Sequence, residues 1–160
     1  MRKSITIKDA KIGTGNFRNF SGEERKFNNA GKRNFCLFLE QDLADDLEED
    51  GWNVRYLDPR DEGDDPIPYL SVAINYGVKP PKIVTVTSRG QTILDEEDIH
   101  ILDWAEFEKV DLMINGSAWE INGKSGVKGY VDTMYITISE NELELMYNDI
   151  PAIAEHEDGY

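Results

Sequence analysis

Apolar and polar residues alternate with a period of two along most of the chain, which is the pattern of half-buried β-strands. Ile5, Ile7 and Ile12 predict a first strand, which residues 17–20 continue after the Gly-Thr-Gly break at 13–15. The segment RNFCLFLE at 33–40 is apolar on both faces and predicts a buried strand. Further strands are predicted at 52–57, 69–76, 82–87, 110–114, 118–121 and 127–138.

Two short segments show helical spacing instead. In residues 42–50, Leu43 and Leu47 lie four apart with Ala44 on the same stripe, and Gly51 follows at the position of a C-terminal cap. The segment DEEDIHILD, from Asp95, begins with acids, which suit the first turn of a helix. The stretches at 21–32 and 58–68 are predicted loops because they are rich in Gly, Asn, Pro and Asp.

Many short strands, two short helices and long loops predict a mainly β fold. A five-stranded β-barrel of the oligonucleotide-binding (OB) type with additional strands fits this element count, although periodicity alone also allows a β-sandwich. We expect one domain over residues 1–148. Residues 149–160 are acidic, lack periodicity and contain Pro151, and they predict a flexible C-terminal tail.

Composition narrows the setting of this domain. The chain has 160 residues, of which 39% are apolar, and no apolar run approaches the ~20 residues of a membrane span. Its first residues carry charge and show no apolar signal-peptide core. Cys36 is the single cysteine, so no intrachain disulfide can form. These observations predict a cytoplasmic protein.

The net charge of −15 is unevenly distributed along the chain. Residues 1–33 contain nine Lys or Arg and three acids, a balance of +6, which leaves −21 for the other 127 residues. Such asymmetry predicts a basic patch on an acidic body. A soluble acidic protein with a chance basic start is the alternative.

Short motifs give no support for an enzyme. The segment AWEINGKS at 118–125 matches a permissive phosphate-binding loop, but bulky residues fill its middle and a strand follows it. It predicts a β-hairpin turn that exposes Lys124 and Lys128. His100 and His156 are isolated, and the acids at 61–65 lack the calcium-loop spacing. We therefore expect no catalytic residues, no metal ligands and no cofactor.

Cations and aromatic residues alternate in the basic segment, which is the mixture that binds a single-stranded nucleic acid. Cations follow the phosphates, and aromatic faces stack on bases at ~1–3 kcal/mol each. Core packing is the alternative for each phenylalanine, and we expect it for Phe35. A second mixture of cationic and aromatic residues lies at 52–57. Tyr69 and Trp119 are weaker candidates for DNA contacts. The candidate DNA-binding residues are Phe17, Arg18, Phe20, Arg25, Lys26, Phe27, Lys32, Arg33, Trp52, Arg55, Tyr56, Lys124, Lys128 and Tyr130.

The C-terminal segment carries a third signal. From Glu140 onward there are seven acids and no Lys or Arg, and the last residue is aromatic, Tyr160. We expect the tail acids Glu155, Glu157 and Asp158 to compete with DNA for the basic surface. A frayed, solubilising end is the alternative.

Three blocks together resemble phage-encoded single-stranded DNA-binding proteins with an OB fold: FRNFSGEERKFNNAGKRNFCLFL, LADDLEEDGWNVRYL and WEINGKSGVKGYVDTMYITI. The resemblance extends from about Ile5 to Tyr147. It implies a non-enzymatic accessory protein of phage replication or recombination that coats single strands with little sequence specificity, in the cytoplasm of the bacterial host. The tail with Tyr160 is similar to the partner-recruiting tails of other single-stranded DNA-binding proteins.

Two other functions remain open. A metal-dependent phage nuclease would need two or three carboxylates around one Mg²⁺ ion, and no spacing in the sequence requires this. An acidic DNA mimic is compatible with the acidic body, but it gives the cation and aromatic segment no purpose.

Overall fold

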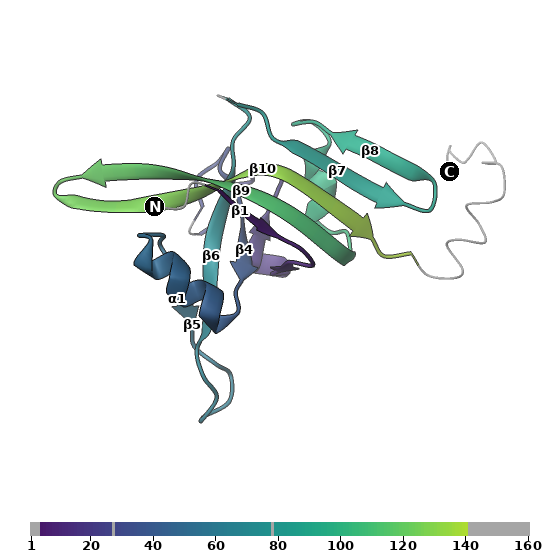
Figure 1. The fold of residues 1–160 in the computed structure, drawn as a ribbon. Coiled ribbons are helices and arrows are strands. Elements are labelled where there is room, and N and C mark those ends of the chain that lie inside the picture. Colours follow the sequence, from purple (N-terminus) through teal and green to yellow (C-terminus); the bar gives the residue numbers. More distant parts are fainter. Residues whose placement is uncertain (1–3, 27, 78, 141–160) are drawn as a thin grey trace.

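The computed structural model describes residues 4–26, 28–77 and 79–140, which form one ten-stranded sheet with a single α-helix beside it (Figure 1). Phe27 and the expected tail at 149–160 lie outside the described residues. The strands are β1 (Ser4–Ile7), β2 (Lys11–Ile12), β3 (Arg18–Asn19), β4 (Arg33–Phe38), β5 (Arg55–Leu57), β6 (Ile67–Ile74), β7 (Lys82–Thr87), β8 (Gly90–Leu94), β9 (Phe107–Ile121) and β10 (Lys124–Ile138). The helix α1 spans Gln41–Glu49, and two 3₁₀ helices, η1 and η2, span Gly15–Phe17 and Ile99–Asp103.

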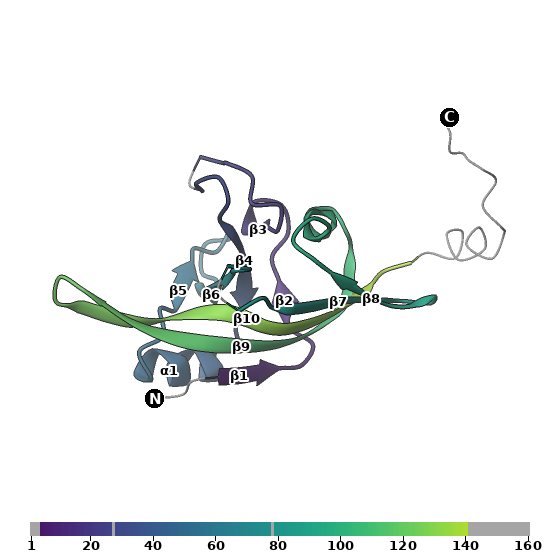
Figure 2. The same cartoon turned by 90° about the horizontal axis from the view of Figure 1, so that it is seen from above.

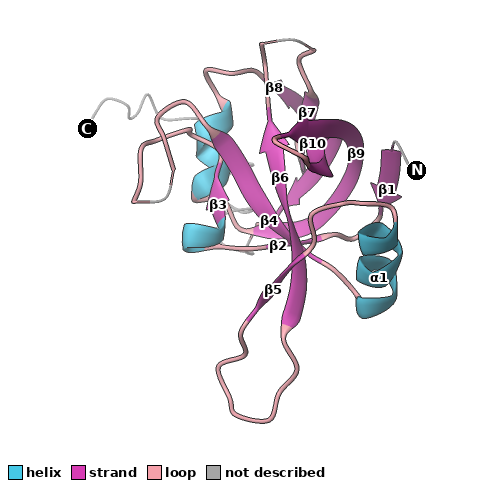
Figure 3. Cartoon of the chain, turned by 90° about the vertical axis from the view of Figure 1, so that its left-hand side faces the viewer, coloured by secondary structure: helices cyan, strands magenta, loops and turns pink. Residues whose placement is uncertain are grey.

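The mainly β class is confirmed, but the sheet is not a closed barrel. Its main path runs β1-β9-β10-β6-β4-β2, and the two end strands are consecutive pieces of the N-terminal segment. The sheet curls so that the chain between them crosses from β9 to β4, and the Ala10 N–H donates to the Val110 carbonyl at 2.7 Å (Figure 3). This bond and a second one, from the Asp9 N–H to the Asp111 carboxylate at 3.0 Å, link the chain to β9 in place of the ladder that would close a barrel.

Strand β10 organises the sheet because three strands pair with different parts of it. It pairs with β9 along nearly its whole length, in parallel with β6 at Gly129 and Tyr130, and in parallel with β7 further on. The β9 and β10 hairpin forms a long bent ribbon whose tip extends beyond the other elements (Figure 2). Its turn, Asn122 and Gly123, has φ values of 53° and 81°, as a two-residue hairpin turn requires.

The sequence pattern predicted two strands, at 110–114 and 118–121, because Asn115, Gly116 and Ser117 interrupt the apolar positions. The structure makes them one strand, β9, and the glycine has a packing role. A Cβ atom at Gly116 would lie 2.7 Å from Cζ2 of Trp52. The backbone of β9 therefore passes directly over the indole ring, whose residue is 3% exposed.

The helix predicted near residues 42–50 is confirmed as α1, with Ala44 and Leu47 buried and Gly51 at φ 93° after its end. The second predicted helix is the 3₁₀ helix η2. Its buried residues, Ile99 and Leu102, are three apart, which matches the 3₁₀ period of three residues per turn. The sequence did not predict β8, whose residues are mostly exposed.

Candidate nucleic-acid interface

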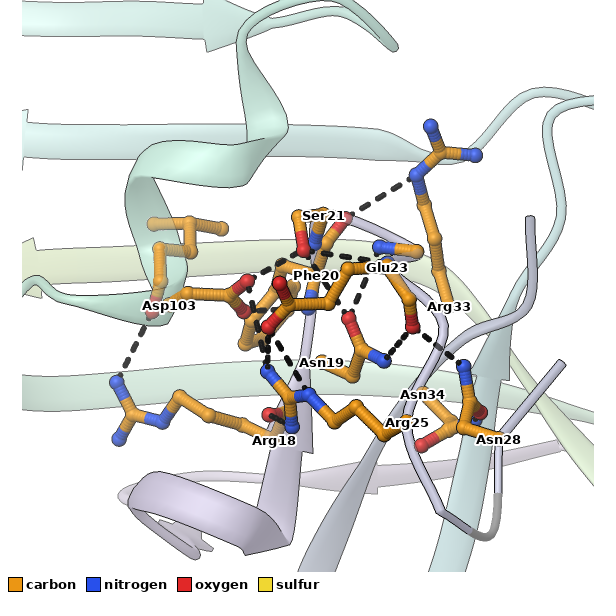
Figure 4. Close-up of polar contacts among 12 residues, drawn as sticks. Arg18, Asn19, Phe20, Ser21, Glu23, Arg25, Asn28, Arg33, Asn34 and Asp103 are labelled. Carbon is orange, nitrogen blue, oxygen red and sulfur yellow. Dashed lines mark hydrogen bonds and ion pairs between the residues drawn. The ribbon is translucent and has the colours of Figure 1, made fainter. Parts of the chain in front are cut away.

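Arg18 comes from the basic segment, yet its side chain is held inside the protein (Figure 4). Nε donates to the Gly13 carbonyl at 2.7 Å, and Nη1 donates to the carbonyls of Leu102 and Ala105 at 3.1 and 3.0 Å. The residue is 4% exposed, and desolvation lowers the pKa of its guanidinium below the usual value. Arg18 therefore joins the N-terminal segment to η2, and its guanidinium is not open to DNA.

Asp103, the last residue of η2, holds the backbone just after Arg18. Its carboxylate accepts from the backbone N–H groups of Phe20 and Ser21 at 2.5 and 3.2 Å. Arg25 lies 3.9 Å from the same carboxylate, donates to the Arg18 carbonyl at 2.7 Å and pairs with Glu23 at 2.9 Å. These contacts shape the loop that precedes β4.

Arg33, the first residue of β4, is also largely engaged within the protein. Its Nε donates to the Phe20 carbonyl at 3.1 Å and its Nη1 pairs with Glu96 at 3.0 Å, which leaves 16% of the side chain exposed. The guanidinium lies 5.7 Å from the ring centroid of Tyr76. Burial raises the pKa of Tyr76 to about 12, so this phenol stays protonated at neutral pH.

Three of the predicted DNA-binding residues are core residues, and we correct those predictions here. Phe20 is fully buried and stacks on Phe35 at 5.5 Å between ring centroids. Trp52 is buried beneath the β9 and β10 hairpin, and Arg18 is held as described above. The sequence prediction for Phe35 as a core residue is confirmed, since it is 1% exposed.

Four adjoining hollows cross the outer face of β4, β6 and β10. Each hollow shares a lining residue with the next: Ser71 lines the first and second, Lys128 the second and third, and Asn75 and Tyr130 the third and fourth. We call this surface the basic band. The cations that line it are Arg25, Lys26, Lys32, Arg33, Arg55, Lys79 and Lys128, and the acids are Glu96 and Asp132.

The second hollow, of about 460 Å³, brings two cations and two aromatic side chains together. Arg55 of β5 lies directly across from Tyr69 of β6, and Lys128 and Trp119 come from the β9 and β10 hairpin. Trp119 is 37% exposed and lies against the backbone of Gly126, where a Cβ atom would be 2.9 Å from its ring. Two cations and two aromatic side chains therefore line one hollow.

Of three further candidates, Tyr130 lines the basic band, whereas Phe17 and Lys124 line none of its hollows. Tyr130 lines the third and fourth hollows, and the Lys128 ammonium lies 5.6 Å from its ring centroid. Phe17 is 37% exposed and packs edge-on against Phe38. Lys124 is exposed beside the hairpin turn.

Tyr56 and Arg55 lie on opposite faces of β5, as the strand alternation predicts. The Tyr56 hydroxyl donates to Glu48 and accepts from Gln41, both of α1, so Tyr56 faces the helix and not the basic band. Arg55 instead lines the second hollow.

Sequence reasoning ranked Tyr69 and Trp119 low and did not identify Lys79. No local signal marks these residues, because they meet only through the parallel pairing of β6 with β10 and the length of the β9 and β10 hairpin. The charge asymmetry was the useful signal, since four of the seven cations of the basic band belong to residues 1–33.

In residues 4–26, 28–77 and 79–140, no three His, Cys, Asp or Glu side chains are grouped so that they could hold a metal ion. None of the helices in those ranges has the length and apolar character to cross a membrane.

Comparison with known proteins shows the family of this chain. Residues 2–158 match the model of a protein family described as a putative phage single-stranded DNA-binding domain. The single-stranded DNA-binding protein from bacteriophage Enc34 has a similar structure, with a TM-score of 0.53 and 7% identity over 87% of this chain and 83% of that chain. Its complex with single-stranded DNA matches with a TM-score of 0.53 and 9% identity over 87% and 88%. At such identities the likeness shows the fold. A search of curated proteins finds no match.

Proposed function

From the premise that this chain belongs to the family of phage single-stranded DNA-binding domains, we propose that it binds the strand along the basic band. The observation that carries the proposal is the contrast in charge. Seven cations and two acids line the basic band, while the whole chain has a net charge of −15. A polyanion is therefore attracted to this face and repelled by much of the remaining surface.

The chemistry of the basic band suits a single strand better than a duplex. Tyr69, Trp119 and Tyr130 offer ring faces, and unpaired bases can stack on such faces whatever their sequence. A duplex keeps the faces of its bases stacked on one another, so it loses these contacts. Little sequence specificity follows, because every base has a π-face.

A binding role without catalysis fits the same surface. The chain would coat exposed strands during phage replication or recombination, in the cytoplasm of the host cell. Recruitment of a replication or recombination protein by the acidic segment that ends in Tyr160 belongs to this proposal and rests on the sequence alone.

Fluorescence anisotropy with labelled oligo-dT tests the proposal. We expect binding that weakens with salt, with a slope of log K against log[salt] of about −3 to −4 if ~4–6 phosphates are neutralised. A labelled duplex of equal length should bind more weakly. Equal affinity for duplex, or a slope near zero, would exclude the basic band as the binding surface. Addition of Mg²⁺ should leave the oligonucleotide uncut, and cleavage would favour the nuclease alternative.

A further inference from the structure

The first hollow of the basic band, of about 410 Å³, is lined by side-chain amides. Asn16, Asn19, Asn28 and Asn34 face it together with Ser71, which also lines the second hollow. Amides can donate and accept hydrogen bonds at the same time, so their orientation decides which partner they select.

The hydrogen bonds fix the orientation of Asn28. Its Nδ2 donates to three carbonyls, those of Glu23, Asn29 and Lys32, at 3.1, 3.0 and 3.0 Å. Figure 4 shows the contact with Glu23. The opposite orientation would place an oxygen against three carbonyl oxygens, which is unfavourable. The Oδ1 atom of Asn28 is therefore an acceptor.

The orientation of Asn34 follows from that of Asn28. Asn34 Nδ2 donates to Asn28 Oδ1 at 2.9 Å, so the amide nitrogen faces Asn28 and the Oδ1 atom is the other end of the amide. In Asn19, by contrast, the Oδ1 atom is already occupied, because it accepts from the Ser21 hydroxyl and the Gly22 N–H, while Nδ2 donates to the Glu23 carbonyl. Asn34 Oδ1 is thus a pre-oriented acceptor at this hollow.

We propose that the first hollow takes one nucleobase of the bound strand and that Asn34 Oδ1 accepts a hydrogen bond from its exocyclic amino group. This inference rests on the proposed function, since the base reaches the hollow from the strand that stacks on Tyr69 and Trp119 next to it. Cytosine, adenine and guanine each carry an exocyclic amino group and are favoured over thymine, which has none.

Thymine is disfavoured at this position for a steric and electrostatic reason. Its one N–H is recessed between two carbonyl oxygens, and both would approach the oxygen of Asn34. One hydrogen bond gained or lost corresponds to a preference of about three- to tenfold. Such a preference at a single position is compatible with weak overall sequence specificity.

The affinities for two pyrimidine oligomers, compared directly, test this inference, because the oligomers match in length, charge and ring size. Labelled oligo-dC and oligo-dT are titrated at equal salt and at pH 8, where cytosine is neutral. We expect about three- to tenfold tighter binding of oligo-dC by the unaltered chain. Asn34→Ala and Asn34→Leu should reduce the ratio to about one while both oligomers still bind. Asn34→Leu keeps the number and branching of the side-chain heavy atoms, and the thermal unfolding midpoint of each variant shows whether it is folded.

Gln91→Ala is the control, since it removes an exposed amide of β8 that lies outside the basic band, and it should preserve the preference. Equal affinity of the unaltered chain for both oligomers would overturn the inference and leave single-strand binding intact. A preference that survives in the folded Asn34 variants would overturn it as well. Failure of both oligomers to bind would overturn the proposed function itself.

Discussion

The guanidinium of Arg18 lies 3.9 Å from the ring centroid of Phe107, on the first residue of β9. Its nitrogen atoms also donate hydrogen bonds to three backbone carbonyls, one at Gly13 and two at Leu102 and Ala105, far along the chain. Because the cation is enclosed by a ring and by carbonyl oxygens, it stabilises the fold and leaves DNA contacts to other cations.

Arg18→Ala should therefore lower the free energy of unfolding by about 3 kcal/mol, because hydrogen bonds to charged groups contribute ~1.5–3 kcal/mol each and their loss leaves buried carbonyls unpaired. Urea unfolding measures the change. Arg60→Ala, an exposed arginine in the loop before β6, is the control and should change stability by less than ~0.5 kcal/mol. Unchanged stability with weakened DNA binding would place Arg18 at the DNA.

Lys128→Ala should reduce the magnitude of the salt slope by about 0.7, the single-strand value for one phosphate contact. Lys128 lines the second and third hollows, in the middle of the basic band. Lys109→Ala makes the same change in charge at an exposed lysine that pairs with Asp111 at 3.7 Å and does not line the basic band. Anisotropy titrations at several salt concentrations compare the two. Equal slopes for both variants would contradict the assigned path of the strand.

Trp119→Ala should weaken binding by ~1–3 kcal/mol without changing the salt slope, because stacking releases no counterions. Trp104→Ala serves as the comparison, since Trp104 is 74% exposed but lies after η2, away from the basic band. The readout is oligo-dT affinity at fixed salt. A larger loss for Trp104→Ala would show that the strand follows another face.

Gly116→Ala should destabilise the protein by about 1–3 kcal/mol through overpacking. The added methyl group would meet two indole carbons of Trp52 at 2.7 and 2.8 Å and a methyl of Val127 at 2.8 Å. Ser117→Ala, at the next and exposed position, is the control. Thermal unfolding of both variants is the measurement, and an unaltered midpoint for Gly116→Ala would mean that the ring can move aside.

Truncation after Asn148 should tighten single-strand binding several-fold at low salt, with a smaller gain at high salt. The prediction rests on the sequence, because the removed acids, Glu155, Glu157 and Asp158 among them, would compete with phosphates as a tethered ligand. Salt screens this competition once the Debye length falls below ~8–10 Å. Affinity is measured for both chains at two salt concentrations, and weaker binding after truncation would count against the idea.

The local pattern of the sequence determined most of the secondary structure. Strand β7 matches the predicted residues 82–87, and α1 lies within one residue of its predicted ends. Alternation and helical spacing are properties of neighbouring residues, so they can be read without the fold. The sequence also determined that a cationic surface lies on an acidic chain, since charge does not depend on packing.

Only the tertiary structure decided which cations are exposed and which aromatic rings accompany them. Arg18 and Arg55 both lie in short strands beside aromatic residues. Arg18 is buried and donates hydrogen bonds to carbonyls 84 and 87 residues away, whereas Arg55 lines the second hollow. Likewise Tyr69 and Trp119 become neighbours through strand pairing that brings β6 beside β10. Burial and proximity of this kind depend on long-range contacts, and the residues that supply those contacts carry no mark in their own neighbourhood of the sequence.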